Sequence, residues 1–190
     1  MPLVPALRVL AELRTDEIVV TTMGSTREWP KLSSHPLDFH HIPSAMGHSP
    51  ALALGLALAQ PERQVIAITG DGSLLMSLGV LATIVAAGVR NLAVIVLDNG
   101  IYEVTGGQTT AGAVARVDFV GFATAAGFES VAFFDDLLDW QAGAAQVLAM
   151  PGPQFICLRV EPERENYFLN PPGPTQERID RFRAALAPKS

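Results

Sequence analysis

Cysteine, aromatic residues and charge are all scarce in this chain of 190 residues. It contains one cysteine, 7% aromatic residues and 17% charged residues. A single cysteine excludes a disulfide framework, and the apolar run 155–158 around Cys157 predicts a buried thiol. No apolar run reaches the ~20 residues of a membrane-spanning helix, and the first residues lack the pattern of a signal peptide. We therefore expect a cytoplasmic protein without membrane contact.

The charge that is present is mostly negative. The net charge is −6 and the isoelectric point is near 5.1, which argues against nucleic-acid binding through bulk charge. Hydrophobic residues make up 49% of the chain, a high share for a freestanding domain of this length. We therefore expect part of the surface to meet another subunit. The length suits a single domain over residues 1–190.

Short apolar runs alternate with helical patterns along the chain. Strands are expected at 18–22, 65–68, 92–97, 129–133 and 154–160, and helices at 2–13, 50–60, 74–88, 118–126 and 135–149. This alternation predicts a three-layer α/β/α fold around a parallel sheet. The segment 27–39 should be irregular, because Trp29 and His35 each precede a proline. Residues 161–190 form a proline-containing arm with a charged helix at 175–186, which packs on a neighbouring chain or frays.

Two polar turns follow neighbouring strands of the predicted sheet. The first carries Gly70, Asp71 and Gly72, and the second carries Asn99. Because ligands collect at the carboxyl ends of parallel strands, Asp71 and Asn99 can converge there. Glycines let backbone amides face an anion, and carboxylate and amide oxygens suit Mg²⁺, which often shares phosphate ligands. The sequence thus predicts a diphosphate–Mg²⁺ site, with ordinary turns as the alternative. A dinucleotide site is less favoured, because no G-x-G-x-x-G is present.

Gly70–Asp71–Gly72, a spacer of 25 residues and Asp98–Asn99 together resemble the signature of thiamine-diphosphate-dependent enzymes. The likeness extends from about residue 18 to residue 131. It implies a thiamine-diphosphate-binding fold in which Asp71, Asn99 and the main-chain carbonyl of Ile101 bind Mg²⁺. The amides of Gly72 and Ser73 would meet the diphosphate. The family often has asparagine where Asp98 stands, but that position is not a ligand.

The resemblance extends the site to two further segments. The loop 24–26 would reach the diphosphate, although its hydroxyls could instead cap the next helix. Met46 would wedge beneath the cofactor, with core packing as the alternative, and the carbonyl of Ser44 would accept a hydrogen bond from the aminopyrimidine. The residues that the resemblance assigns to the cofactor are Gly24, Ser25, Thr26, Ser44, Met46, Gly70, Asp71, Gly72, Ser73, Asn99, Ile101 and Tyr102.

His40 and His41 do not form a plausible metal site, because neighbouring residues of a strand point to opposite faces. One of them lining the active site stays open as an alternative. The polar, glycine-rich segment 103–112 predicts a mobile or partner-contacting loop over the site. Glu103 and Gln108 could meet substrate or cofactor there, with exposure to solvent as the default.

The chain has the size of the family's diphosphate-binding domain alone. The glutamate that activates the cofactor comes from a separate pyrimidine-binding domain, so the resemblance implies a partner chain that carries the catalytic residue. It also implies a 2-oxo acid decarboxylase of the sulfopyruvate or phosphonopyruvate type, with Arg27 and Arg116 as candidates for a cationic pocket. Alternatives are an acetolactate-synthase-like carboligase, an oxidoreductase β subunit, and a catalytically silent cofactor-binding partner. The oxidoreductase would bring cysteine ligands for iron–sulfur clusters.

Overall fold

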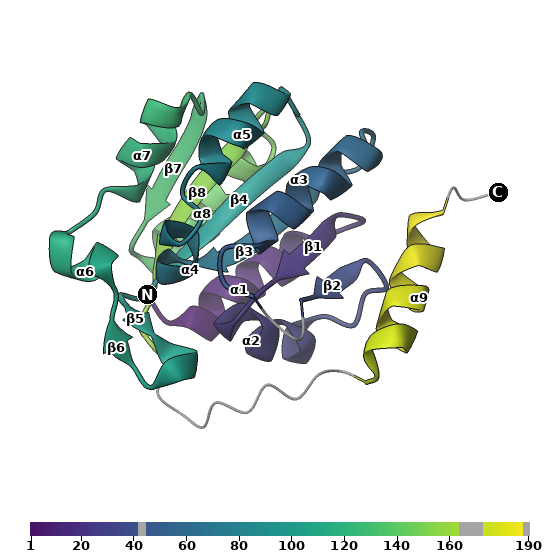
Figure 1. Cartoon of the computed structure of the whole chain (residues 1–190), viewed down its shortest axis with the longest axis horizontal. Helices are drawn as coiled ribbons and strands as arrows, with labels where there is room; N and C mark the ends of the chain where they lie inside the picture. Colours follow the sequence, from purple (N-terminus) through teal and green to yellow (C-terminus); the bar gives the residue numbers. More distant parts are fainter. Residues whose placement is uncertain (42–44, 164–172, 188–190) are drawn as a thin grey trace.

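A six-stranded, fully parallel sheet forms the centre of the computed structural model, which describes residues 1–41, 45–163 and 173–187. The strand order is β2-β1-β3-β4-β8-β7, and every pair is parallel. Helices cover both faces of the sheet (Figure 1), so the predicted three-layer α/β/α fold is confirmed. The strands are β1 Ile18–Thr21, β2 Asp38–His40, β3 Val65–Gly70, β4 Leu92–Asp98, β7 Ser130–Phe134 and β8 Gln154–Arg159.

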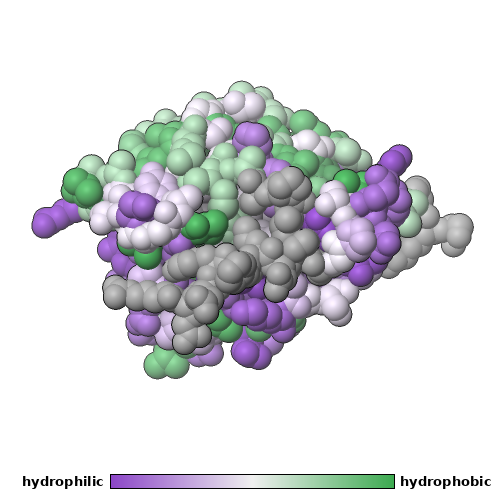
Figure 2. Space-filling view, turned by 60° about the horizontal axis from the view of Figure 1, so that its bottom comes forward, coloured by the Kyte–Doolittle hydropathy of each residue, from purple (hydrophilic) through white to green (hydrophobic). Residues whose placement is uncertain are grey.

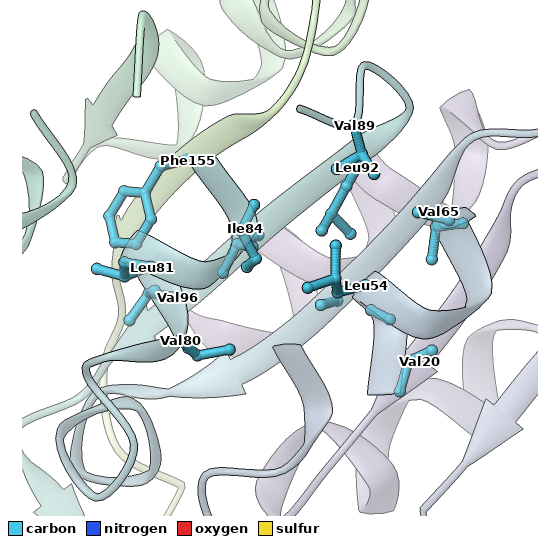
Figure 3. Packing of buried hydrophobic residues seen from close by; sticks show 14 of the residues in the cluster. Val20, Leu54, Val65, Val80, Leu81, Ile84, Val89, Leu92, Val96 and Phe155 are labelled. Atoms are coloured by element: carbon cyan, nitrogen blue, oxygen red, sulfur yellow. The ribbon is translucent and has the colours of Figure 1, made fainter. Parts of the chain in front are cut away.

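The helices divide into two layers. Side chains of α1 (Leu3–Leu13), α2 (Gly24–Leu32) and α8 (Leu137–Leu148) share one buried cluster with one face of the sheet. On the other face lie α3 (Ser49–Ala59), α4 (Asp71–Leu75), α5 (Val80–Ala87) and α7 (Phe119–Ala126). Figure 3 shows this second core, where Leu54 and Ile84 pack over Val65 and Val96. Strands β3 and β4 are almost wholly buried, as apolar strands at the centre of a parallel sheet should be.

Hydrophobic side chains also remain on the surface. Leu58 of α3 and Met76 after α4 are more than half exposed. Figure 2 shows hydrophobic residues across its upper part, and hydrophilic residues at the right, where α9 (Thr175–Leu186) lies. Contact of this apolar surface with another subunit stays a prediction. In the part of the chain that the structure describes, no helix is long and apolar enough to cross a membrane.

The helix predicted over 74–88 is wrong as a single element. α4 ends at Leu75 and α5 begins at Val80, with turns between them in which Ser77 N–H bonds to Leu74 O and Val80 N–H to Ser77 O. Serine and glycine are weak helix formers, so Ser77 and Gly79 favour this break. α5 ends at Gly88, which is left-handed at φ +66°, the conformation that glycine favours after a helix.

The segment expected to be irregular, 27–39, is mostly regular. α2 continues to Leu32 with Pro30 inside it, and β2 follows at 38–40. Trp29 is 1% exposed and its Nε1 donates to the Asp38 carboxylate at 2.9 Å. Proline near the end of the helix removes few hydrogen bonds, so burial of Trp29 outweighs this cost.

The charged helix predicted over 175–186 is present as α9, and it packs against this chain. The Phe182 ring meets the Phe39 ring edge-on at 5.1 Å, and Arg178 donates to the His40 carbonyl at 2.8 Å. Cys157 is buried as predicted, and burial raises its pKa to about 12.

His40 gives the fold a pH dependence. Its Nδ1 lies 3.1 Å from the Thr21 hydroxyl, and burial, with Arg178, Arg181 and Arg14 adding to it and Asp38 opposing it, lowers its pKa to about 4. Between pH 6.5 and pH 4 the histidine therefore binds a proton in the unfolded chain but not in the folded chain.

We expect this histidine to reduce the free energy of unfolding as pH falls from 6.5 towards 4, by about 2 kcal/mol at pH 5. Urea unfolding of His40→Asn, whose amide oxygen replaces Nδ1, should show a smaller loss between pH 8 and pH 5. The exposed His48→Asn serves as the control. Equal losses in all three proteins would contradict this assignment.

Candidate functional site

Three turns at the carboxyl ends of β1, β3 and β4 enclose a pocket. The α4 helix and the small hairpin of β5 (Ile101–Tyr102) and β6 (Gln108–Thr109) lie at this end of the sheet (Figure 1). Of the predicted site residues, most line the pocket: Gly24, Ser25, Met46, Gly70, Gly72, Ser73, Asn99, Ile101 and Tyr102. Asp71 and Thr26 are buried and lie outside the lining, although Gly70 and Gly72 on either side of Asp71 belong to it. Ser44 falls outside the described residues.

Asp71 is the first residue of α4 and is 1% exposed. Its Oδ2 accepts a hydrogen bond of 2.6 Å from the Thr110 hydroxyl. Burial raises the pKa of the carboxyl, while Thr110 and the Gly72 N–H oppose that rise. A buried carboxylate with neutral donors is poorly compensated, so this position favours a cation beside it.

Asn99 supplies a second oxygen at the same end of the sheet, because it follows β4, the neighbour of β3. Its Oδ1 accepts the N–H of Ile101 at 3.0 Å, a local turn that orients the start of β5. An amide oxygen has two lone pairs, so one stays free for a metal ion. Asp71 and Asn99 thus fit the oxygen chemistry of Mg²⁺. Among the described residues no group of three His, Cys, Asp or Glu side chains could hold a metal, so backbone or ligand oxygens would have to complete the shell.

The two glycines of the first turn have different roles. A Cβ on Gly70 would meet nothing within 4 Å, so this glycine borders open space. A Cβ on Gly72 would overlap the Tyr102 ring and stand 3.0 Å from Thr110 Cγ2. Gly72 is therefore required by the packing of the hairpin on α4, in addition to any approach of a ligand to its amide.

The hydroxyl groups of the β1–α2 turn form hydrogen bonds within the turn and to the end of β1. Ser25 Oγ donates to Thr22 O at 2.7 Å and accepts from Thr22 N, and Thr26 Oγ1 donates to Thr21 Oγ1 at 3.2 Å. Neither caps α2, whose N-cap is Met23 at φ 52°. The suggested capping role is therefore wrong, and the hydroxyls hold the turn together. A role for the turn in binding diphosphate stays a prediction.

Met46 also lines the pocket, and Gly47 follows it in the chain. Gly47 N–H donates to Ser73 Oγ at 2.8 Å, and Gly47 is left-handed at φ +82°. This bond ties the turn to α4. Met46 is only half-buried and faces the pocket, which disfavours the reading of plain core packing.

Glu103, which the sequence left as a possible ligand contact, and Thr110, which the sequence did not reveal, both belong to the site. Exposure to solvent was the default expectation for Glu103, and it is wrong, because the residue is 5% exposed in the pocket wall; contact with a ligand stays a prediction. Burial raises its pKa, and the Glu163 N–H, Arg27 and Asn99 oppose the rise. Thr110 caps the short helix α6 (Ala111–Ala115) and also reaches Asp71. Only the tertiary fold brings these residues to the turns.

The other polar candidates lie elsewhere. Neither His40 nor His41 lines the pocket. Arg27 forms an ion pair with Glu28 at 2.5 Å. Arg116 is exposed and borders a second hollow, beside Asp98 and Arg159. A cationic substrate pocket built from Arg27 and Arg116 thus has no support within the described residues.

The contrast between the two glycines is testable in the free chain. Gly72→Ala should lower the free energy of unfolding by about 1–3 kcal/mol, because the methyl group overpacks against Tyr102. Gly70→Ala meets open space and should stay within about 0.5 kcal/mol of the wild type. Urea titration measures both, and equal losses would refute the distinction.

Comparison with known proteins identifies a family that matches this chain. Residues 22–158 match the family described as thiamine pyrophosphate enzyme, C-terminal TPP binding domain. Phosphonopyruvate decarboxylase of Streptomyces viridochromogenes is 39% identical over 178 residues, which are 93% of this chain and 44% of that protein. Sulfopyruvate decarboxylase subunit beta of Methanothermobacter thermautotrophicus is 38% identical over 84% of this chain and 82% of that subunit. The chain thus spans less than half of the streptomycete relative.

A solved structure agrees with the fold. The X-ray structure of an enzyme assigned to the thiamin diphosphate-dependent class, from Mycobacterium smegmatis, superposes with a TM-score of 0.70. It covers 85% of this chain and 32% of that chain at 22% identity, so it supports the fold alone. The family match and the decarboxylase relatives show that this chain belongs to the thiamine pyrophosphate enzymes, and that it corresponds to their C-terminal TPP-binding domain.

Proposed function

We propose that this chain is the diphosphate- and Mg²⁺-binding subunit of a thiamine-diphosphate-dependent 2-oxo acid decarboxylase of the sulfopyruvate or phosphonopyruvate type. The observation that carries the proposal is the buried Asp71 carboxylate, which shares the end of the sheet with the Asn99 amide. The relatives named above support the reaction type, because both are named decarboxylases.

Within this proposal the residues of each wall contact a different part of the cofactor or the metal ion. Asp71, Asn99 and the carbonyl of Ile101 hold Mg²⁺, and the amides of Gly72 and Ser73 meet the diphosphate. The turn at 24–26 closes the diphosphate end. Met46 supports the cofactor from below, while Ser44 and Tyr102 complete its contacts. The bound cofactor supplies the nucleophilic carbon and the electron sink that decarboxylation of a 2-oxo acid requires.

The active site is completed by a second chain. The acids of the described pocket wall are Glu103 and, just below, Asp71, and both are engaged by neighbouring donors. Neither is therefore placed as the free carboxyl that must exchange a proton with the aminopyrimidine. The name "subunit beta" of the methanogen relative, and the greater length of the streptomycete relative, support a pyrimidine-binding partner that brings this glutamate.

Mg²⁺-dependent binding of the cofactor tests the metal site. Asp71→Asn keeps the shape but removes the charge, so we expect a loss of about 100-fold or more in affinity for thiamine diphosphate with Mg²⁺. Calorimetric titration measures it on the full chain with its partner. The exposed Asp139→Asn is the matched control and should bind normally. Unchanged binding by Asp71→Asn would refute the metal site.

The partner and the reaction are tested by tagged purification from cells that make the protein, with Mg²⁺ and thiamine diphosphate present. We expect a stoichiometric second chain, and release of CO₂ from sulfopyruvate or phosphonopyruvate. Acetolactate formed from pyruvate would favour the carboligase, and electron transfer to an iron–sulfur partner would favour the oxidoreductase. A cofactor-loaded complex with no turnover would favour the silent partner. A homo-oligomer without cofactor would contradict the proposal.

A further inference from the structure

Glu103 is an unusual residue for the wall of a site that should bind a diphosphate. It follows the β5 strand directly and begins a short 3₁₀ turn, a place where an acid is normally solvated. Instead its side chain is buried, at 5% exposure. Burying a carboxylate is costly unless donors compensate it, so its partners indicate what holds it there.

The carboxylate contacts segments far apart in the sequence. Its Oε1 accepts the N–H of Glu163, just beyond β8, at 2.8 Å. Its Oε2 stands 2.9 Å from the point where a Cβ of Gly24 would lie, so it rests against the backbone of the β1–α2 turn. That approach exists only because residue 24 has no side chain.

Electrostatics favours the same arrangement. The nine-residue helix α2 begins at Gly24 and has no acidic residue in its own first turn. A negative group there is stabilised by the partial positive charge of the helix N-terminus, and Glu103 supplies it from another element. Arg27, one turn further along α2, attracts the same carboxylate.

We propose that Glu103 is a positioning residue: its buried carboxylate joins the β1–α2 turn to the β4–β5 turn and the chain after β8, and so fixes the opening of the cofactor pocket. The β4–β5 turn carries Asn99, whose side chain hydrogen-bonds to the Glu103 carboxylate, and Ile101 begins β5 directly after this turn; the β1–α2 turn carries Gly24. The inference rests on the proposed function for the identity of the ligand. Groups that orient metal ligands from behind typically change metal affinity 10- to 100-fold when lost.

The first test is Glu103→Gln, which keeps the size and an acceptor for Glu163 but removes the charge. At fixed thiamine diphosphate, we expect the Mg²⁺ concentration for half-saturation to rise about 10-fold. The thermal unfolding of the free chain should stay unchanged. Glu129→Gln, the same change at an exposed position, should titrate as the wild type. A merely structural role would lower the unfolding temperature and leave the Mg²⁺ titration unmoved.

A second variant changes Gly24, the other partner in the contact with the Glu103 carboxylate. Gly24→Ala places a methyl group against Oε2 and should displace the flexible end of Glu103 without altering its chemistry. If the contact is what matters, the double variant should be no worse than either single variant, because both remove one interaction. Additive losses would overturn the proposal.

Amide hydrogen exchange of segment 22–27, measured in the free full chain, tests the positioning role of Glu103 without any cofactor. Both single variants should exchange faster there than the wild type and Glu129→Gln. Equal exchange in all four proteins would overturn the positioning role. If the wild type fails to bind thiamine diphosphate with Mg²⁺, the proposed function fails, while faster exchange would still support the role of Glu103.

Discussion

The burial of one carboxylate at the end of β3 is the constraint on which the site depends. Asp71 is held by the Thr110 hydroxyl and the Gly72 N–H, both neutral donors. Such donors compensate a buried charge only in part, which is why its pKa rises. The paired, buried strands β3 and β4 fix the start of α4, where this carboxylate lies. A cation at the pocket would relieve this cost.

The β5–β6 hairpin then determines the shape of the pocket. It places the Tyr102 ring against Gly72, and the Glu103 carboxylate in the same segment against Gly24. It also leads into Thr110, which bonds Asp71 from below. One short segment therefore contacts all three turns at the carboxyl edge. This couples the packing of the hairpin to the geometry of any ligand site there.

Local sequence rules failed where tertiary contacts outweighed them. Pro30 was expected to prevent a helix, yet the burial of Trp29 and its bond to Asp38 keep α2 intact to Leu32. The stretch 74–88 was expected as one helix, yet turns around the weak helix formers Ser77 and Gly79 divide it, and Ser77 lies beside the left-handed Gly47. Glu103 was expected in solvent, because no local pattern signals that Glu163 and Gly24 will meet it.

The sequence by itself determined the parallel α/β fold, the positions of β1, β3, β4, β7 and β8 within a few residues, and the two turns that carry Asp71 and Asn99. These follow from short-range patterns: apolar β-branched runs, glycine stops, and polar residues directly after strands. Only the tertiary structure decided which groups support those turns. Thr110 lies 39 positions from Asp71, and Glu163 lies 60 positions from Glu103. Contacts of that separation depend on the packing of whole elements, which periodicity does not encode.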